Sequence, residues 1–92
     1  MKIVAVCGMG IGTSVLLKMN AEKVLRTLGK DQDVDVEAAD IGTAKGAART
    51  ADIVLTSADL ADEIGEVPAK VVIIDNFTDV GEIAEKLTPL VS

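Results

Sequence analysis

The stretch that decides the fold is KIVAVCGMGIGTSVLLKMN, residues 2–20. Residues 2–6 are mostly apolar and β-branched, and glycines follow soon after, which is typical of a short buried strand. Residues 8–12 form a glycine-rich loop, and from Thr13 or Ser14 to about Leu28 the apolar residues recur at helical spacing. The stretch therefore predicts a strand that passes through a tight loop into a helix.

The same alternation continues to the end of the chain. Residues 34–38 alternate apolar and polar, residues 53–55 and 71–74 are apolar runs, and helical patterns cover residues 43–49, residues 58–64 and a last segment from Asp79. Strands joined through helices run parallel. We therefore expect an α/β fold of the flavodoxin or Rossmann-like kind: a four-stranded parallel open sheet, order 2-1-3-4, with helices on both faces. Residues 1–92 are expected to form a single domain, because so short a chain cannot divide its core.

Glycine, proline and capping residues predict where the helices begin and end. Gly29 and Gly65 stand where the first and third helices should stop. Asp79, with Glu82 three residues later, predicts a start of the capping-box type for the last helix. Pro89 is expected to limit that helix, because proline has no amide hydrogen to donate.

Composition excludes several classes of function. Nine basic residues against fifteen acidic ones leave a net charge of −6, which opposes binding to nucleic acid and to anionic membrane surfaces. With one cysteine and no histidine, the chain is expected to contain no internal disulfide, no usual zinc site and no cofactor. No stretch has the length of a membrane span. We expect a cytoplasmic protein that is monomeric in isolation.

The loop after the first strand carries the predicted chemistry. Glycines at alternate positions let consecutive backbone N–H groups converge, and the following helix adds its unpaired N–H donors and the positive end of its dipole. The same field favours the thiolate of Cys7, which is the nucleophilic form. The predicted catalytic residue is Cys7, and the predicted phosphate-binding loop comprises Gly8, Met9, Gly10, Ile11, Gly12, Thr13 and Ser14.

Comparison with known phosphate-binding loops reduces the number of reactions that this loop could support. The loop lacks the Lys-Ser/Thr ending of a Walker loop, and its glycines do not have GxGxxG spacing. It is closer to the phosphatase loop Cys-x5-Arg-Ser/Thr, but Thr13 stands at the position of the arginine that clamps the transferring phosphoryl group. This favours a carrier of phosphate. Two alternatives stay open: a hydrolase like the low-molecular-weight protein tyrosine phosphatases, and a non-catalytic flavodoxin-like binding domain.

These residues resemble a known family. The segment Val6–Ser14, with the later segments Ala51–Ser57 and Val72–Phe77, is similar to the IIB components of the phosphoenolpyruvate-dependent phosphotransferase system (PTS) of the lactose, galactitol and ascorbate type. The ascorbate-like branch is nearest, although Met9 and Thr13 replace the Asn and Ser expected there. The resemblance implies that Cys7 accepts a phosphoryl group from a phosphohistidine of a IIA protein or domain. It also implies delivery to a sugar bound in the membrane component IIC, to which this chain would be peripheral on the inner face.

Further residues are expected at the same edge of the sheet. Met9 and Ile11 are flanked by glycines, so at least one is expected to face a protein partner. Asp40, Ser57, Asp75 and Asn76 follow the other strands. A carboxylate beside a phosphocysteine would repel it, so Asp40 and Asp75 are predicted to face a partner and not the phosphate. Ser57 and Asn76 are expected on the same partner-facing rim.

Overall fold

The computed structural model describes residues 1–6 and 11–91, apart from the side chains of residues 11–14, 41 and 45. Strands and helices alternate along the chain. The strands are β1 (Lys2–Val6), β2 (Asp35–Ala39), β3 (Ile53–Thr56) and β4 (Lys70–Ile73). The helices are α1 (Ile11–Leu28), α2 (Ile41–Ala48), α3 (Ala58–Ile64) and α4 (Val80–Val91).

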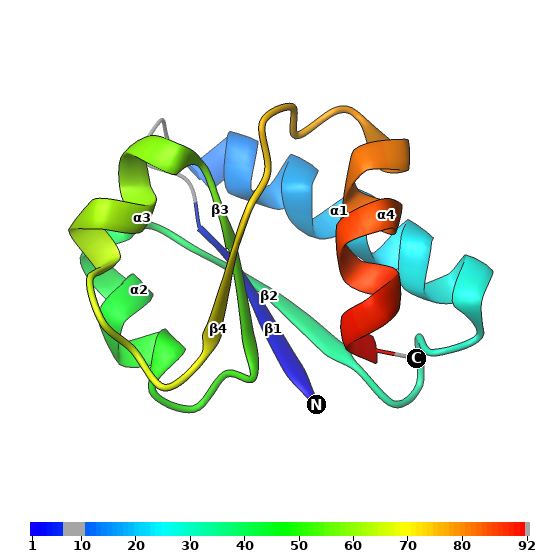
Figure 1. The fold of residues 1–92 in the computed structure, drawn as a ribbon, viewed down its shortest axis with the longest axis horizontal. Coiled ribbons are helices and arrows are strands. Elements are labelled where there is room, and N and C mark those ends of the chain that lie inside the picture. The colour runs from blue at the N-terminus through cyan, green and yellow to red at the C-terminus, as the bar shows by residue number, and fades with distance from the viewer. Residues whose placement is uncertain (7–10, 92) are drawn as a thin grey trace.

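The strands form one parallel sheet in the order β2-β1-β3-β4, which confirms the predicted α/β fold and its topology. Helices cover both faces: α1 and α4 lie on one side of the sheet, and α2 and α3 lie on the other (Figure 1). The strand order reverses direction between β1 and β3. In open parallel sheets, ligands bind beyond the carboxyl ends of the strands near this switch point.

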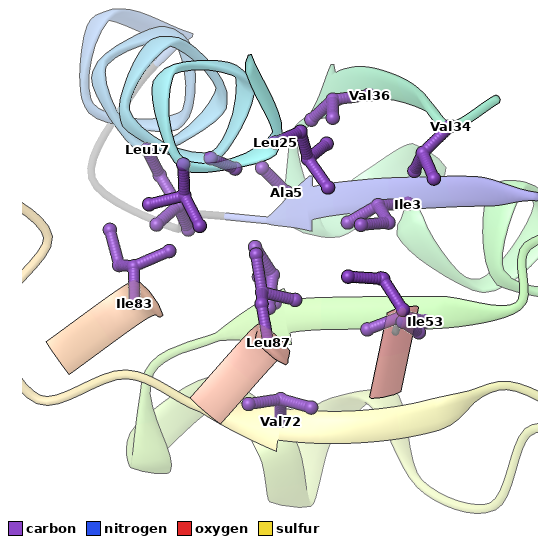
Figure 2. Packing of buried hydrophobic residues seen from close by; sticks show 14 of the residues in the cluster. Ile3, Ala5, Leu17, Leu25, Val34, Val36, Ile53, Val72, Ile83 and Leu87 are labelled. Atoms are coloured by element: carbon purple, nitrogen blue, oxygen red, sulfur yellow. The ribbon is translucent and has the colours of Figure 1, made fainter. Parts of the chain in front are cut away.

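Side-chain alternation along the strands divides the core in two. Ile3 and Ala5 of β1 and Ile53 and Leu55 of β3 pack under α1 and α4, where Leu17 and Leu87 meet them (Figure 2). The alternate residues pack under α2 and α3, against alanines of α2 and the larger Leu60 and Ile64 of α3. This second cluster contains Val4, Val6, Ala39, Ala44, Ala48, Ala51, Val54, Leu60, Ile64 and Ala69. Burial of both sheet faces explains why β1 and β3 are almost wholly apolar.

Several helix boundaries differ from the predicted ones. α2 runs from Ile41 to Ala48, whereas the pattern predicted residues 43–49. α1 begins at Ile11, ahead of the predicted Thr13 or Ser14. Gly12 costs a helix about 1 kcal/mol relative to alanine, and the buried face from Leu17 onward outweighs that cost. α4 continues past Pro89 to Val91, so Pro89 does not end it. Val91 is buried in the core, and this packing holds the last turn although proline removes one helical hydrogen bond.

The predicted glycine stop of α1 is confirmed by its geometry. Gly29 has a φ of 75°, in the left-handed region that L-residues rarely adopt. Its amide donates to the carbonyl of Arg26 at 3.1 Å, and the amide of Lys30 donates to the carbonyl of Leu25 at 2.8 Å. These two bonds form a Schellman motif, which satisfies carbonyls at the helix end and turns the chain toward β2.

Candidate functional site

The carboxyl ends of the four strands lie at one edge of the sheet, and β1 and α1 frame its centre. β1 ends at Val6 and α1 begins at Ile11. The predicted residues Cys7, Gly8, Met9 and Gly10 lie outside the described residues, as do the side chains of Ile11, Thr13 and Ser14. The backbone of Ile11–Ser14 forms the first turn of α1, which contains no acidic residue. The positive end of the helix dipole therefore meets no carboxylate from its own first turn.

Asp40 follows β2 and caps α2. Its carboxylate Oδ1 accepts hydrogen bonds from the Thr43 amide at 2.9 Å and from the Thr43 hydroxyl at 3.1 Å. These bonds satisfy a backbone donor that the first helical turn leaves unpaired. Asp40 is also exposed, so one carboxylate oxygen serves the helix while the side chain remains accessible from solvent.

Ser57 follows β3 and occupies the N-cap position of α3 without capping it. Its backbone is extended, with φ −85° and ψ 163°, and its side chain makes no cap hydrogen bond. The Ser57 carbonyl accepts the first helical bond, from the amide of Ala61 at 3.1 Å. The hydroxyl is half-buried at the same edge of the sheet as the end of β1.

Asp75 and Asn76 follow β4 in a loop that Glu82 holds from α4. The two Glu82 carboxylate oxygens accept from the backbone amides of Asp75 at 2.8 Å and Asn76 at 2.9 Å. The Lys86 ammonium donates to the same carboxylate at 2.7 Å and to the carbonyl of Ile73 at 2.6 Å. The Lys86 hydrogen bond, followed by the two amide bonds, lowers the pKa of Glu82 from 4.5 to about 2. The bond to Glu82 raises the pKa of Lys86.

The capping prediction for α4 is half right. Asp79 Oδ1 accepts from the Glu82 amide at 3.1 Å, as a capping aspartate should. The Glu82 carboxylate, however, reaches past Asp79 to Asp75 and Asn76. Asn76 turns its own side chain inward, because its Oδ1 accepts from the Thr78 amide at 3.0 Å and the Thr78 hydroxyl at 2.6 Å. The β4–α4 loop is thus fixed by its own Asn76 side chain and by Glu82 of α4.

Sequence reasoning assigned no role to two features of this edge. Thr56, the last residue of β3, is wholly buried, and threonine at a strand end is too common to stand out. Val15, Leu16 and Met19, in the first half of α1, have exposed side chains. Their helical spacing places them on a face that the sheet does not cover, a signal that the sequence pattern did contain.

Three other kinds of feature are relevant in the described residues: a metal cluster, a membrane-spanning helix and an apolar hollow. In that part of the chain, no cluster of three or more metal-ligating side chains occurs, and no helix is long and apolar enough to cross a bilayer. An apolar hollow lies between α1 and α4, lined by Val24, Leu28, Val80 and their neighbours. It faces the C-terminal half of α1, about 20 Å along the helix from its start. The hollow is therefore remote from the end of β1.

Known proteins resemble this chain over most of its length. Residues 2–89 match the family described as "PTS system, Lactose/Cellobiose specific IIB subunit". A protein of Mycoplasma pneumoniae named "Ascorbate-specific PTS system EIIB component" is 39% identical over 87 residues, which cover 94% of this chain and 90% of that relative. Both matches confirm the resemblance that the Cys7 segment predicts.

Proposed function

The chain belongs to the lactose/cellobiose-specific IIB family of the PTS, and on that basis we propose that it is a phosphoryl relay with Cys7 as its nucleophile. The thiolate attacks the phosphorus of a phosphohistidine on a IIA protein or domain. The N–P bond breaks, the imidazole leaves with its electron pair, and an S–P bond forms on Cys7. A hydroxyl of a sugar held by the membrane component IIC then attacks the phosphorus. An O–P bond forms as the S–P bond breaks, the hydroxyl proton is released to solvent, and the Cys7 thiolate is regenerated.

One observation carries this proposal: only four residues separate the end of β1 from the start of α1, next to the switch point of the sheet. Helix N-termini offer unpaired amides and a partial positive charge to an anion. With no acidic residue in the first turn of α1, that charge is available to a thiolate or a phosphocysteine at position 7. In the proposal, the backbone of residues 8–14 stabilises the phosphoryl oxygens.

The partner-facing surface in this proposal surrounds Cys7. It includes Met9 and Ile11 with the exposed rim residues Asp40, Asp75 and Asn76, and the half-buried Ser57. The exposed apolar side chains of Val15, Leu16 and Met19 extend it along α1. A relay must bind two proteins in turn, so an open surface suits it better than a deep cleft. The chain would act in the cytoplasm, at the inner face of the membrane through IIC, and IIC would select the sugar.

The test is phosphorylation followed by mass spectrometry. The protein is incubated with phosphoenolpyruvate, the general PTS proteins and a candidate IIA. We expect one phosphoryl group on Cys7 in the wild type and none in Cys7→Ser. Cys7→Ala combined with Ser57→Cys keeps one thiol, moved to the neighbouring strand end, and should stay unlabelled.

The result also separates the alternatives. A wild type that stays unlabelled beside a IIB protein known to accept from the same donor refutes the relay. Release of inorganic phosphate over many turnovers, without a lasting label, would indicate a phosphatase. Neither label nor turnover would indicate a binding domain.

A further inference from the structure

β4 is an edge strand, and its open side carries backbone groups that a further strand could use. In the sheet that the described residues form, β4 pairs with β3 and no strand lies beyond it. The Ile74 amide donates to the Thr56 carbonyl of β3 at 2.8 Å. Because successive residues of a strand direct their backbone groups to opposite sides, Ile73 and Asp75 direct theirs toward the open side.

The Glu82–Lys86 ion pair of α4 binds two of these groups. Lys86 Nζ donates to the Ile73 carbonyl at 2.6 Å, and Glu82 Oε2 accepts from the Asp75 amide at 2.8 Å. Lys86 Nζ and the same Oε2 lie 2.7 Å apart. In a parallel ladder, one residue of the next strand makes both bonds: its amide donates to one carbonyl, and its carbonyl accepts from the amide two residues further along. The ion pair therefore occupies the place of one residue of a fifth strand.

The side chains on the open side of β4 suit a second copy of the same strand. Val71 and Ile73 lie on one face of the sheet by strand alternation. Val71 is half-buried, and Ile73 is 40% exposed. Two β4 strands paired antiparallel about a twofold axis would place Val71 of one copy opposite Ile73 of the other. Such apolar cross-strand pairs stabilise a sheet.

The opposite edge of the sheet is protected by charge. β2 presents the exposed side chains of Asp35 and Glu37. Charged side chains on an edge strand oppose pairing with another chain. In β4 the exposed charge is confined to Lys70, the first residue, and an apolar side chain is exposed at Ile73. The β4 edge of a second copy is therefore a better partner for β4 than the β2 edge.

We infer that the Glu82–Lys86 ion pair closes the β4 edge, which is a pairing surface for β4 of a second copy of this chain when the Ile73 carbonyl is free. Antiparallel pairing through Ile73 needs that carbonyl as the acceptor for an amide of the second strand. The Lys86 ammonium already fills it. Neither Cys7 nor phosphoryl transfer enters into this role.

Replacing the ammonium should open the edge. Lys86→Met keeps the length of the side chain and removes the donor to Ile73. It also makes the net charge of the chain more negative, which by itself opposes association between copies. We expect the dimer dissociation constant of Lys86→Met to be lower than that of the wild type by about tenfold or more. Sedimentation velocity over a series of protein concentrations measures this constant.

Two matched variants identify the cause. Lys23→Met makes the same change at an exposed lysine of α1, and its dissociation constant should equal that of the wild type. Lys86→Arg retains a charged donor near Ile73 and should also behave like the wild type. Should Lys86→Met fail to fold, Lys86→Ala beside Lys86→Arg repeats the comparison.

Hydrogen exchange locates the interface. The amides of Val71 and Ile73 face the open side of β4, so their exchange should slow as the concentration of Lys86→Met rises. Adding Ile73→Lys to Lys86→Met places a charge on the edge and should restore the monomer.

Three results would overturn the inference. In the first, Lys86→Met associates no more tightly than Lys23→Met. In the second, Lys86→Met associates while the Val71 and Ile73 amides keep the exchange rates of the monomer, because the copies then meet through another surface. In the third, these amides already slow with concentration in the wild type to the same extent, because the ion pair then does not close the edge.

Discussion

The ends of β3 and β4 lie side by side at one edge of the sheet but handle polar groups in opposite ways. Beyond β4, the amides of Asp75 and Asn76 point at an anion, and that anion is the chain's own Glu82. At the end of β3, the Thr56 hydroxyl is buried and has no partner among the described residues. The polar groups named at the end of β4 are satisfied by the chain itself, whereas the Thr56 hydroxyl at the end of β3 still has hydrogen-bonding capacity.

The difference shows which part of the edge can serve a phosphoryl group. A pair of backbone amides is a good phosphate site only while it is empty. At β4 the pair is filled by a carboxylate, which would also repel a phosphate. Near β1 and β3, the start of α1 contributes no carboxylate. The electrostatics of the edge therefore favour the β1 end for anion chemistry and make the β4 end a rigid support.

Removing the apolar anchor beneath the β4 loop should have the largest effect. Ile74 directly precedes Asp75 and is 1% exposed, whereas its neighbour Ile73 is 40% exposed. We expect Ile74→Ala to lower the free energy of unfolding by about 3 kcal/mol, measured by urea denaturation, because it leaves a cavity. Ile73→Ala is the matched control and should cost about 1 kcal/mol or less. Equal costs at the two positions would show that the β4 end is not anchored as described.

The Glu82 carboxylate should make the β4 end sensitive to acid. Its pKa in the folded protein is about 2, below the ordinary 4.5, so its stabilising effect is complete above pH 4.5 and disappears as the pH falls toward 2. The thermal midpoint of Glu82→Gln should therefore lie below that of the wild type at pH 6, and the gap should close by pH 2. Glu85→Gln removes an exposed charge from the same helix and should show no such closing gap. A gap that stays constant with pH would contradict the network.

The smallest effect should come from the tether between α1 and the β4 loop. The Asn20 side-chain amide donates to the carbonyl of Phe77 at 2.7 Å, in a partly buried position. Asn20→Ala should cost about 1 kcal/mol and speed amide exchange around residues 77–79. Met19→Ala alters an exposed neighbour and serves as the control. Equal exchange in the two variants would mean that Asn20 does not hold this loop.

Much of the fold could be predicted from the residues alone. Runs such as Ile53–Leu55 and the helical spacing of Leu17, Ala21 and Val24 reflect local geometry and burial. The exact ends of the helices were harder to predict. Gly29 marked its helix end correctly because only a residue tolerant of positive φ fits there. Pro89 misled, because the burial of Val91 is a tertiary contact that no local pattern contains.

The candidate site, too, has parts that could be predicted from the sequence and parts that could not. The prediction of Cys7 as the nucleophile came from one continuous segment, in which a strand, alternating glycines and a helix start follow one another, and it stays a prediction. The roles of Asp40 and Asn76 in capping and turn formation involve bonds two or three residues away, and were foreseeable as common uses of these residue types. The reach of Glu82 to Asp75, seven residues back, was not foreseeable, because the path of the β4–α4 loop had first to be known.

The sequence by itself determined the alternation of strands and helices, the parallel sheet and the resemblance that the family match confirms, because periodicity and short motifs are local properties of a chain. Only the tertiary structure decided which polar groups at the carboxyl edge are already satisfied. Glu82 fills the amides of the β4 loop, whereas Thr56 is sealed beside the last residue of β1. That distinction depends on which strands are neighbours and which face each side chain takes, and both are set only when the sheet assembles.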